Sequence, residues 1–398
     1  MVIKNVIICD VNGERSLDIE IVENIVTQIG ENITSSDYFD AKGAYLLPTL
    51  VDLNVRVKDS SLNSKSIDNL AYEAKKGGVG RVVLVPDSTP SISDEITLEF
   101  VQKHGSEECS VEIECAISAI NDEGNLSNIA ILLKNGALGP YVKTTTNNNL
   151  VSKIAQYTQM YNKTLFVKAE DKSLSSDGVM NEGERSVEFG LSGVSELSEI
   201  LHVSRMIEIA KFYNIDILFK SIATPRSIEL ITQAKKDGVK VKCEVSIHHL
   251  LFSDEKCADF NQVAKLDPPL TSKDRVEKLL LALSNSEIDI LTTLHQDSSL
   301  SAKDVAFVDA SYGCSSIAHA LPLYYTKLVK SGVITMSKLL QLCVQNPSLA
   351  IGENRGTIEV GTKASFTLFD PTKTTEVKDT HSLYNSELLS GKIIQGVL

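Results

Sequence analysis

The sequence predicts an α/β protein in which a (β/α)8 barrel is joined to a small β domain built from both chain termini. From residue 50 to residue 349, short apolar runs alternate with amphipathic stretches of helical period. This alternation is typical of a buried parallel sheet covered by helices. Residues 1–49 and 350–398 instead resemble short strands separated by polar turns. A chain of 398 residues is long enough for both parts.

The N-terminal part has the sequence pattern of β-strands and turns only. Strands are expected at residues 2–9, 18–22 and 38–45, with a turn at residues 10–14, and no stretch there has a helical period.

Eight apolar runs in the middle of the chain have the length and composition of buried strands. They are expected at residues 50–57, 81–86, 111–116, 139–143, 165–169, 216–220, 239–245 and 289–293. Amphipathic helices are expected between them, at residues 66–76, 150–162, 196–212, 226–236 and 273–283. Eight strand–helix units over about 300 residues match the size of a (β/α)8 barrel.

The sequence pattern of β-strands returns after Asn346-Pro347. Strands are expected at residues 356–358 and 364–369, followed by a turn at Asp370-Pro371. No Pro-rich or charged linker separates either end from the barrel, so we expect residues 1–49 and 350–398 to form one composite domain that packs against it.

Charge and hydropathy exclude several partners. Thirty-nine Lys and Arg residues against fifty-two Asp and Glu residues give a net charge of −13. Because an acidic surface repels phosphate backbones, nucleic acid is not an expected partner. No apolar run approaches the roughly 18 residues of a membrane span, and the N-terminus lacks a signal-peptide core, so no membrane association is expected.

The cysteines indicate a reducing environment. Their number is odd and no C-x-x-C pair occurs, which disfavours a disulfide framework and favours a cytoplasmic location. The seven are Cys9, Cys109, Cys115, Cys243, Cys257, Cys314 and Cys343.

Several segments resemble the dihydroorotase family of the amidohydrolases. The run LLPTLVDLNVRVKD is similar to its strand opening P-G-x-x-D-x-H-x-H-x-R, and KAEDKSLSSDGVMNEGERSVEFGLSGVSE is similar to its H-A-E-D and N-E-G segment. Further matches follow in the family's order and cover the whole chain: VPDSTPSISD, EVSIHHLLFSDE, KLDPPLTSKD, TTLHQDSS and QNPSLAIGENRGTIEVGTKASFTLFDP.

The resemblance implies an amidohydrolase barrel with a small β-sandwich domain and an active site at the carboxyl ends of the strands. It also implies chemistry on a zinc-activated water, since water at neutral pH is a poor nucleophile until a metal lowers its pKa toward about 7.

The positions that the resemblance assigns to metal ligands and to the general base do not carry suitable side chains. Asn is a weak ligand for zinc, Arg and Lys are cations, and an aliphatic side chain offers neither a donor atom nor a base. The residues at these positions are Asn54, Arg56, Val142, Lys168, Ser221 and Leu294.

The positions implied for substrate contacts are altered as well. Lys58 replaces an Arg, Asp87 replaces an Asn, and Asp267 and Thr271 replace the Asn and Arg of the N-P-P-L-R box. An acid at Asp87 would repel a dicarboxylate substrate.

These changes predict a catalytically inactive homologue that holds no metal. Arg56 and Lys168 could supply the positive charge of the missing ion and pair with Asp87 or Asp52. A rebuilt zinc site around His248, His249 and His295 is the alternative, although hydrogen bonds from His248 or His249 to the backbone at the top of the barrel are the favoured interpretation.

Three functions remain open. The resemblance includes bacterial members that lack the metal ligands and assemble with aspartate carbamoyltransferase, which favours a non-catalytic, oligomeric subunit in pyrimidine biosynthesis. The second function is an active zinc-dependent dihydroorotase, or a related cyclic-amide hydrolase, with an atypical ligand set. The third is a binding protein for a small anion that uses Arg56, Lys58, Asp87 and Lys168.

Overall fold

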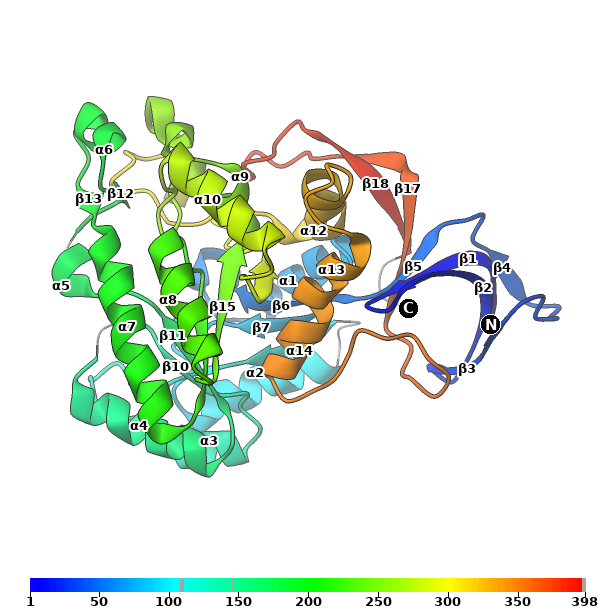
Figure 1. Cartoon of the computed structure of the whole chain (residues 1–398), viewed down its shortest axis with the longest axis horizontal. Helices are drawn as coiled ribbons and strands as arrows, with labels where there is room; N and C mark the ends of the chain where they lie inside the picture. Colours follow the sequence, from blue (N-terminus) through cyan, green and yellow to red (C-terminus); the bar gives the residue numbers. More distant parts are fainter. Residues whose placement is uncertain (108–110, 145, 176, 396–398) are drawn as a thin grey trace.

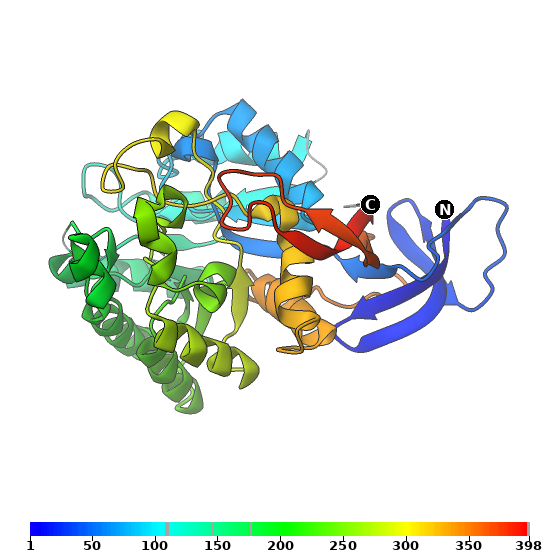
Figure 2. The ribbon, with the colours of Figure 1, turned by 90° about the horizontal axis from the view of Figure 1, so that it is seen from above.

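The computed structural model describes residues 1–107, 111–144, 146–175 and 177–395. A body of strands and helices forms one end of the molecule, and a curved β-sheet that contains the N-terminus forms the other end (Figure 1). A view turned by 90° shows the same two parts side by side, with the C-terminal hairpin running between them (Figure 2).

Parallel strands form a closed barrel in the larger part. Each neighbour pairs in parallel, and β9 continues β8 past a break at Ala116. The first and last strands meet where the Arg56 N–H donates to the His295 carbonyl at 2.9 Å. The predicted (β/α)8 barrel is therefore confirmed. Its strands are β6 (Leu50–Val55), β7 (Val79–Leu84), β8 (Glu112–Cys115), β9 (Ile117–Ser118), β10 (Pro140–Val142), β11 (Thr164–Lys168), β14 (Asp216–Lys220), β15 (Val241–Ser246) and β16 (Ile290–Thr292).

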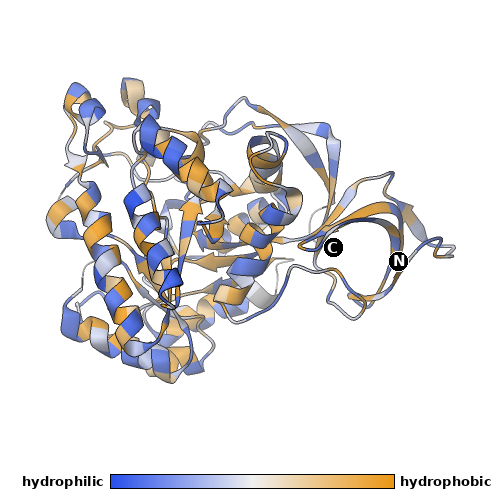
Figure 3. Cartoon of the chain, viewed as in Figure 1, coloured by the Kyte–Doolittle hydropathy of each residue, from blue (hydrophilic) through white to orange (hydrophobic). Residues whose placement is uncertain are grey.

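Helices cover the outside of the barrel and turn apolar stripes toward it (Figure 3). In α1, for example, Ile67, Leu70, Ala71 and Ala74 are buried at the three- and four-residue spacing of one helix face. The covering helices are α1 (Ser64–Lys76), α2 (Glu95–Glu107), α3 (Ile129–Lys134), α4 (Asn148–Met160), α7 (Glu196–Tyr213), α8 (Pro225–Lys236), α10 (Lys273–Ser284), α12 (Ala320–Tyr324), η5 (Tyr325–Val329), α13 (Met336–Leu340), η6 (Gln341–Gln345) and α14 (Asn346–Ala350).

Short elements lie in the connections between strands and helices. They are η1 (Lys58–Ser60), α5 (Lys172–Ser175), β12 (Met180–Asn181), α6 (Glu184–Phe189), β13 (Gly193–Val194), α9 (Ile247–Leu251), η2 (Asp254–Phe260), η3 (Gln262–Ala264), α11 (Leu300–Lys303) and η4 (Ile317–His319).

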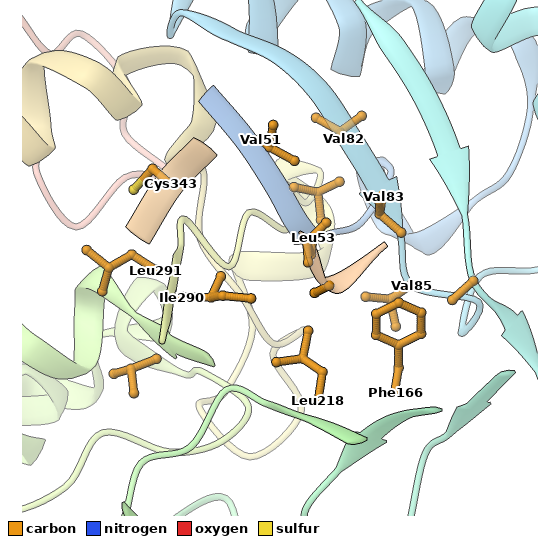
Figure 4. Packing of buried hydrophobic residues seen from close by; sticks show 14 of the residues in the cluster. Val51, Leu53, Val82, Val83, Val85, Phe166, Leu218, Ile290, Leu291 and Cys343 are labelled. Carbon is orange, nitrogen blue, oxygen red and sulfur yellow. The ribbon is translucent and has the colours of Figure 1, made fainter. Parts of the chain in front are cut away.

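The main core fills the barrel interior and the layer beneath the helices. Leu53, Phe166, Leu218 and Ile290 come from four different strands, and each is at most 1 % exposed. Their side chains converge in the close view of this packing (Figure 4). Apolar side chains therefore hold the strands together, and polar chemistry is left to the strand ends.

The smaller part is a seven-stranded sheet that combines both ends of the chain. Its order is β18-β17-β5-β1-β2-β3, with β4 beside β1, and β17 pairs antiparallel with β5. A separate apolar core, which includes Ile3, Ile19 and Phe366, lies against it. The predicted fold class is thus confirmed. The strands are β1 (Val2–Asp10), β2 (Gly13–Val22), β3 (Ile25–Gly30), β4 (Tyr38–Asp40), β5 (Tyr45–Pro48), β17 (Phe366–Glu376) and β18 (Leu388–Gln395).

Two local predictions at the C-terminal end are wrong. The expected turn at Asp370-Pro371 lies inside β17, because a register shift between Asp370 and Thr374 accommodates the proline within the strand. The expected strand at 356–358 has no ladder partner. Its Ile358 N–H donates instead to the Asp10 carboxylate at 3.1 Å.

The remaining sequence-level expectations concern the cysteines and the membrane. Six cysteines are buried and unpaired, and Cys109 lies outside the described residues. Within the described ranges, no helix has the length and apolar character needed to cross a bilayer.

Candidate functional site at the barrel mouth

The candidate site lies at the carboxyl ends of the barrel strands, where (β/α)8 enzymes place their chemistry. A cavity of about 480 Å³ opens there, and its lining includes Lys168, Lys220, Ser221, Asp267 and Tyr312. The structure thus places four predicted site residues, Lys168, Ser221, Asp267 and Thr271, around one cavity. Arg56 and Asp87 lie beside each other in a separate, smaller recess.

Arg56 and Asp87 form a bidentate ion pair. The Arg56 Nε and Nη2 atoms donate to the Asp87 carboxylate at 2.9 to 3.1 Å. Both side chains are largely buried. Burial opposes the charge of Arg56, yet the Asp87 carboxylate raises the Arg56 pKa above its ordinary value. The predicted pairing of Arg56 with Asp87 is confirmed.

Lys168 ends β11 and pairs with two carboxylates that the sequence analysis did not choose. Its Nζ lies 2.6 Å from Asp267 and 3.1 Å from Glu170. Burial opposes the ammonium charge, but these two carboxylates raise the Lys168 pKa. The predicted pairing of Lys168 with Asp87 or Asp52 is wrong, because two closer carboxylates take its ammonium: Glu170 follows β11, and Asp267 follows η3.

Asp52 has a different role. Its Oδ1 accepts from the Thr292 hydroxyl at 2.6 Å, and its Oδ2 accepts from the Thr293 N–H and hydroxyl at 2.8 and 2.6 Å. The carboxylate therefore joins β6 to the end of β16 and closes the barrel with hydrogen bonds rather than with an ion pair.

Asn54 and Ser221 meet at the centre of the mouth. The Asn54 Nδ2 donates to the Ser221 hydroxyl and to the Glu244 carboxylate, each at 2.6 Å. Glu244 in turn accepts from the Lys220 Nζ at 2.5 Å. All four side chains are buried. Burial lowers the pKa of Lys220 and raises the pKa of Glu244.

Sequence reasoning missed Lys220 and Glu244. Each is a charged residue that is buried in its strand: Lys220 ends the run DILFK, and Glu244 lies within VKCEVS. A charge that points into a buried barrel needs a partner of opposite sign, and this signal could have identified the pair.

Val142 and Leu294 provide neither a ligand atom nor a base. Val142 ends β10 and is 1 % exposed, and Leu294 follows β16 and is 3 % exposed. Both side chains are therefore buried, and Val142 belongs to the main apolar core.

Lys58 pairs with Asp297 at 2.9 Å. All the cations of the small-anion hypothesis, Arg56, Lys58 and Lys168, therefore already face a carboxylate of the protein. Such pairing leaves little net positive charge to attract a free anion.

Each of the three histidines of the alternative metal site makes at least one ring-nitrogen hydrogen bond within the protein. His249 bonds the Ser246 hydroxyl at 2.7 Å and the Pro268 carbonyl at 3.1 Å. The predicted backbone bond at the top of the barrel is thus confirmed for His249. Burial lowers the His249 pKa to about 4, so the imidazole is neutral at pH 7.

His248 and His295 are likewise occupied. His248 bonds the Tyr384 hydroxyl through Nδ1 at 2.9 Å and the Cys314 sulfur through Nε2 at 3.3 Å. His295 Nδ1 accepts from the Ser316 N–H at 3.1 Å. Across the described residues, no three His, Cys, Asp or Glu side chains are grouped so that they could share a metal ion.

A divalent ion does not fit the donor set at this mouth. Asn54 turns its N–H bonds toward Ser221 and Glu244, and Arg56 and Lys168 bring positive charge to the positions where the resemblance expects imidazoles. A metal would have to displace these internal pairs before it could bind.

Comparisons with known proteins place the chain in a family. A family model described as dihydro-orotase-like matches residues 43–221. A dihydroorotase of Acetivibrio thermocellus is 32 % identical over 90 % of this chain and 86 % of its own length. A dihydroorotase of Ruminiclostridium cellulolyticum is 31 % identical over 98 % of this chain and 95 % of its own length.

Solved structures agree with the fold. An L-hydantoinase from Arthrobacter aurescens superposes with a TM-score of 0.86 at 19 % identity, covering 100 % of this chain and 94 % of that chain. A D-hydantoinase from Thermus sp. gives a TM-score of 0.83 at 17 % identity, covering 98 % and 92 %. The similarity in sequence along nearly the whole chain, together with this fold, shows that the chain belongs to the dihydroorotase-like family.

Proposed function

We propose that this chain is a non-catalytic member of the dihydroorotase-like family that acts in cytoplasmic pyrimidine biosynthesis without a metal. The observation that carries the proposal is the set of side chains at the mouth: an amide, a guanidinium, an ammonium and a hydroxyl at the implied histidine positions, each bonded to another group of the protein. Without a metal, water at neutral pH stays a poor nucleophile.

The base needed for hydrolysis is also replaced. Leu294 stands at the position that the resemblance assigns to the aspartate that moves the proton, and a buried leucine cannot accept one. Loss of both the nucleophile and the base removes two steps of the hydrolytic reaction, whereas the barrel that carried them is intact.

We infer that the retained barrel serves as a scaffold or regulatory subunit for aspartate carbamoyltransferase in a larger oligomer. This part of the proposal is supported by the resemblance to family members that have lost their metal ligands. It is tested by mixing the chain with the aspartate carbamoyltransferase of the same organism and measuring the mass of any complex by light scattering. Two separate peaks at their own masses, with unchanged transcarbamoylase activity and stability, would contradict it.

An active zinc-dependent dihydroorotase, or a related cyclic-amide hydrolase, is the second candidate. Its support is that relatives 31 to 32 % identical to this chain carry the name dihydroorotase. This candidate requires a ligand set other than the implied one, such as His248, His249 and His295.

Turnover and metal content separate the two candidates. Purified protein is assayed for hydrolysis of dihydroorotate with and without added zinc, and its bound metal is measured in the same preparation. The Acetivibrio thermocellus relative, assayed in parallel, controls for the conditions. We expect neither turnover nor stoichiometric metal. Zinc-dependent turnover would overturn the proposal and favour the second candidate.

A further inference from the structure

The Lys220 ammonium lies deep in the barrel mouth. Its side chain is 3 % exposed, and its partner Glu244 is fully buried. The Nζ donates to the Glu244 carboxylate at 2.5 Å and to the Leu53 carbonyl at 2.8 Å, and it lies 5.7 Å from the centre of the Phe166 ring. One cation thus connects β14 to β15, β6 and β11.

The same carboxylate organises the centre of the mouth. Glu244 Oε1 accepts from Asn54, and Asn54 also donates to Ser221. Asn54 and Ser221 occupy two of the positions that the resemblance assigns to metal-binding histidines. The ammonium therefore belongs to the cluster in which an ion would be expected.

Asp52 adds a second negative charge. It lies close enough for its charge to favour the ammonium form of Lys220, although burial of Lys220 opposes that form. Two buried carboxylates near one another are costly unless a positive charge compensates them.

We propose that the Lys220 ammonium is the chain's own substitute for a divalent cation: it provides the positive charge that the buried Glu244 carboxylate requires and holds the strand ends together. This inference rests on the proposed function, since it takes the mouth to be complete without a metal. Because the ammonium is covalently attached, no chelator can remove it and no free ion can exchange with it.

The proposal makes a specific statement about ions. With Lys220 present, a divalent cation would meet an ammonium among oxygen atoms that are already bonded, so the mouth repels it. Without Lys220, the Glu244 carboxylate and the Leu53 carbonyl would face an uncompensated space near the negative charge of Asp52. Such oxygen donors are those that calcium and manganese prefer.

Thermal unfolding of the full-length chain tests this statement. Wild-type protein and Lys220→Ala are melted in EDTA and, separately, with calcium, manganese or zinc. We expect the wild-type Tm to be the same in every buffer. We expect the Tm of Lys220→Ala to fall by roughly 5 °C in EDTA, because a buried carboxylate loses its partner, and to rise again when calcium or manganese is added.

Two further variants make the result specific. Lys278→Ala removes an exposed lysine that pairs with Asp274 at 2.8 Å, and it should leave the Tm within about 1 °C in all buffers. Lys220→Met with Glu244→Gln removes both charges and keeps an acceptor for Asn54. It should fold even if Lys220→Ala does not, and it should not respond to ions.

The inference is overturned by a wild-type Tm that falls in EDTA or rises with an added ion, by a Lys220→Ala protein as stable as wild type, or by a Lys220→Ala protein that no ion stabilises. A double variant that responds to ions also overturns it. Turnover of dihydroorotate without an ion-dependent Tm would instead overturn only the proposed function, so the two failures are distinguishable.

Discussion

The Lys168 ammonium lies 2.6 Å from the Asp267 carboxylate and joins the end of β11 to the segment that follows η3. Burial would raise the pKa of Asp267, but Lys168 holds it below its ordinary value. The pair therefore fixes one wall of the cavity, and it does so with a cation at a position where the resemblance expects a neutral imidazole.

Lys168→Met is expected to destabilise the chain. It removes the ammonium to which both Asp267 and Glu170 are bonded, and because Asp267 is 36 % exposed the cost is only about 1–2 kcal/mol. Urea unfolding measures it. A double-mutant cycle adds Asp267→Asn and the double variant. The double variant should lose less free energy of unfolding than the sum of the two single losses, and strict additivity would show that the pair contributes nothing.

The same pair predicts a pH dependence. A carboxylate whose folded-state pKa is lowered contributes stability above its unfolded pKa of about 3.9, and loses it as the pH falls through the folded value. The stability difference between wild type and Lys168→Met should therefore be largest at neutral pH and shrink in acid. Unfolding curves at pH 7 and near pH 3 test this, and a constant difference would contradict it.

A lysine at position 56 should not replace Arg56 as the partner of Asp87. The Arg56 guanidinium donates to Asp87 through two nitrogens, a geometry that a lysine cannot reproduce. We expect a loss of about 1–2 kcal/mol for Arg56→Lys and about 3–5 kcal/mol for Arg56→Met, because the pair is largely buried. Differential scanning calorimetry measures both.

Lys58→Met is the matched control for Arg56. Its side chain is 42 % exposed and pairs with Asp297 at the surface, so its removal should cost little. If Arg56→Met were as stable as Lys58→Met, the guanidinium would not be required to compensate charge at the mouth.

Lys303 is expected to hold the segment that borders the cavity. It is 6 % exposed, and its Nζ donates to the carbonyls of Gln262, Ser311 and Gly313 at 2.9, 2.8 and 2.6 Å. Lys303→Met leaves these carbonyls without their donor, at a cost of about 2–3 kcal/mol. Hydrogen exchange of residues 304–313 should accelerate.

The exposed Lys153 on α4 provides the control, since Lys153→Met changes a lysine far from this segment in sequence. Hydrogen exchange of residues 304–313 is compared in wild type, Lys303→Met and Lys153→Met. If it is equally slow in all three, the Lys303 ammonium does not order the segment.

Strand and helix positions in the barrel could be predicted from the sequence because buried parallel strands are continuously apolar and their covering helices are amphipathic. The strand 216–220 coincides with β14, and the helix at 226–236 differs from α8 by one residue. In contrast, β3 is not predicted, because its run IVTQIG is neither continuously apolar nor strictly alternating, and only Val26 in it is buried.

The resemblance identified Arg56, Lys168, Asp87 and Asp267 as positions at the mouth, but it did not determine which of them pair. Opposite charge predicts that Arg56 pairs with Asp87 or Asp52, and the structure shows the pair with Asp87, 31 residues away. Lys168 and Asp267 are 99 residues apart, and Asn54 and Glu244 are 190 apart. Which strand ends meet depends on barrel closure, and this geometry is not encoded in any local pattern.

Glu199 predicts a second, opposite pH dependence. Its carboxylate accepts from the N–H groups of Ala223 and Thr224 at 2.9 and 3.0 Å, where α8 begins, and burial raises its pKa to about 7. A raised folded-state pKa contributes stability that is fully present below the unfolded value of about 4.3 and is lost as the pH rises through 7.

Glu199→Gln removes this titration while keeping a similar shape. The folded wild-type protein holds a proton on Glu199 at pH 5 and has lost it at pH 8, whereas glutamine does not titrate. The stability of the variant relative to wild type should therefore be lower at pH 5 than at pH 8. Glu208 is exposed and lies on α7, the helix that also carries Glu199, so Glu208→Gln should show no such change. The Tm of each variant is compared with that of wild type at pH 5 and at pH 8. If the Tm difference for Glu199→Gln changes with pH no more than that for Glu208→Gln, the raised pKa does not belong to Glu199.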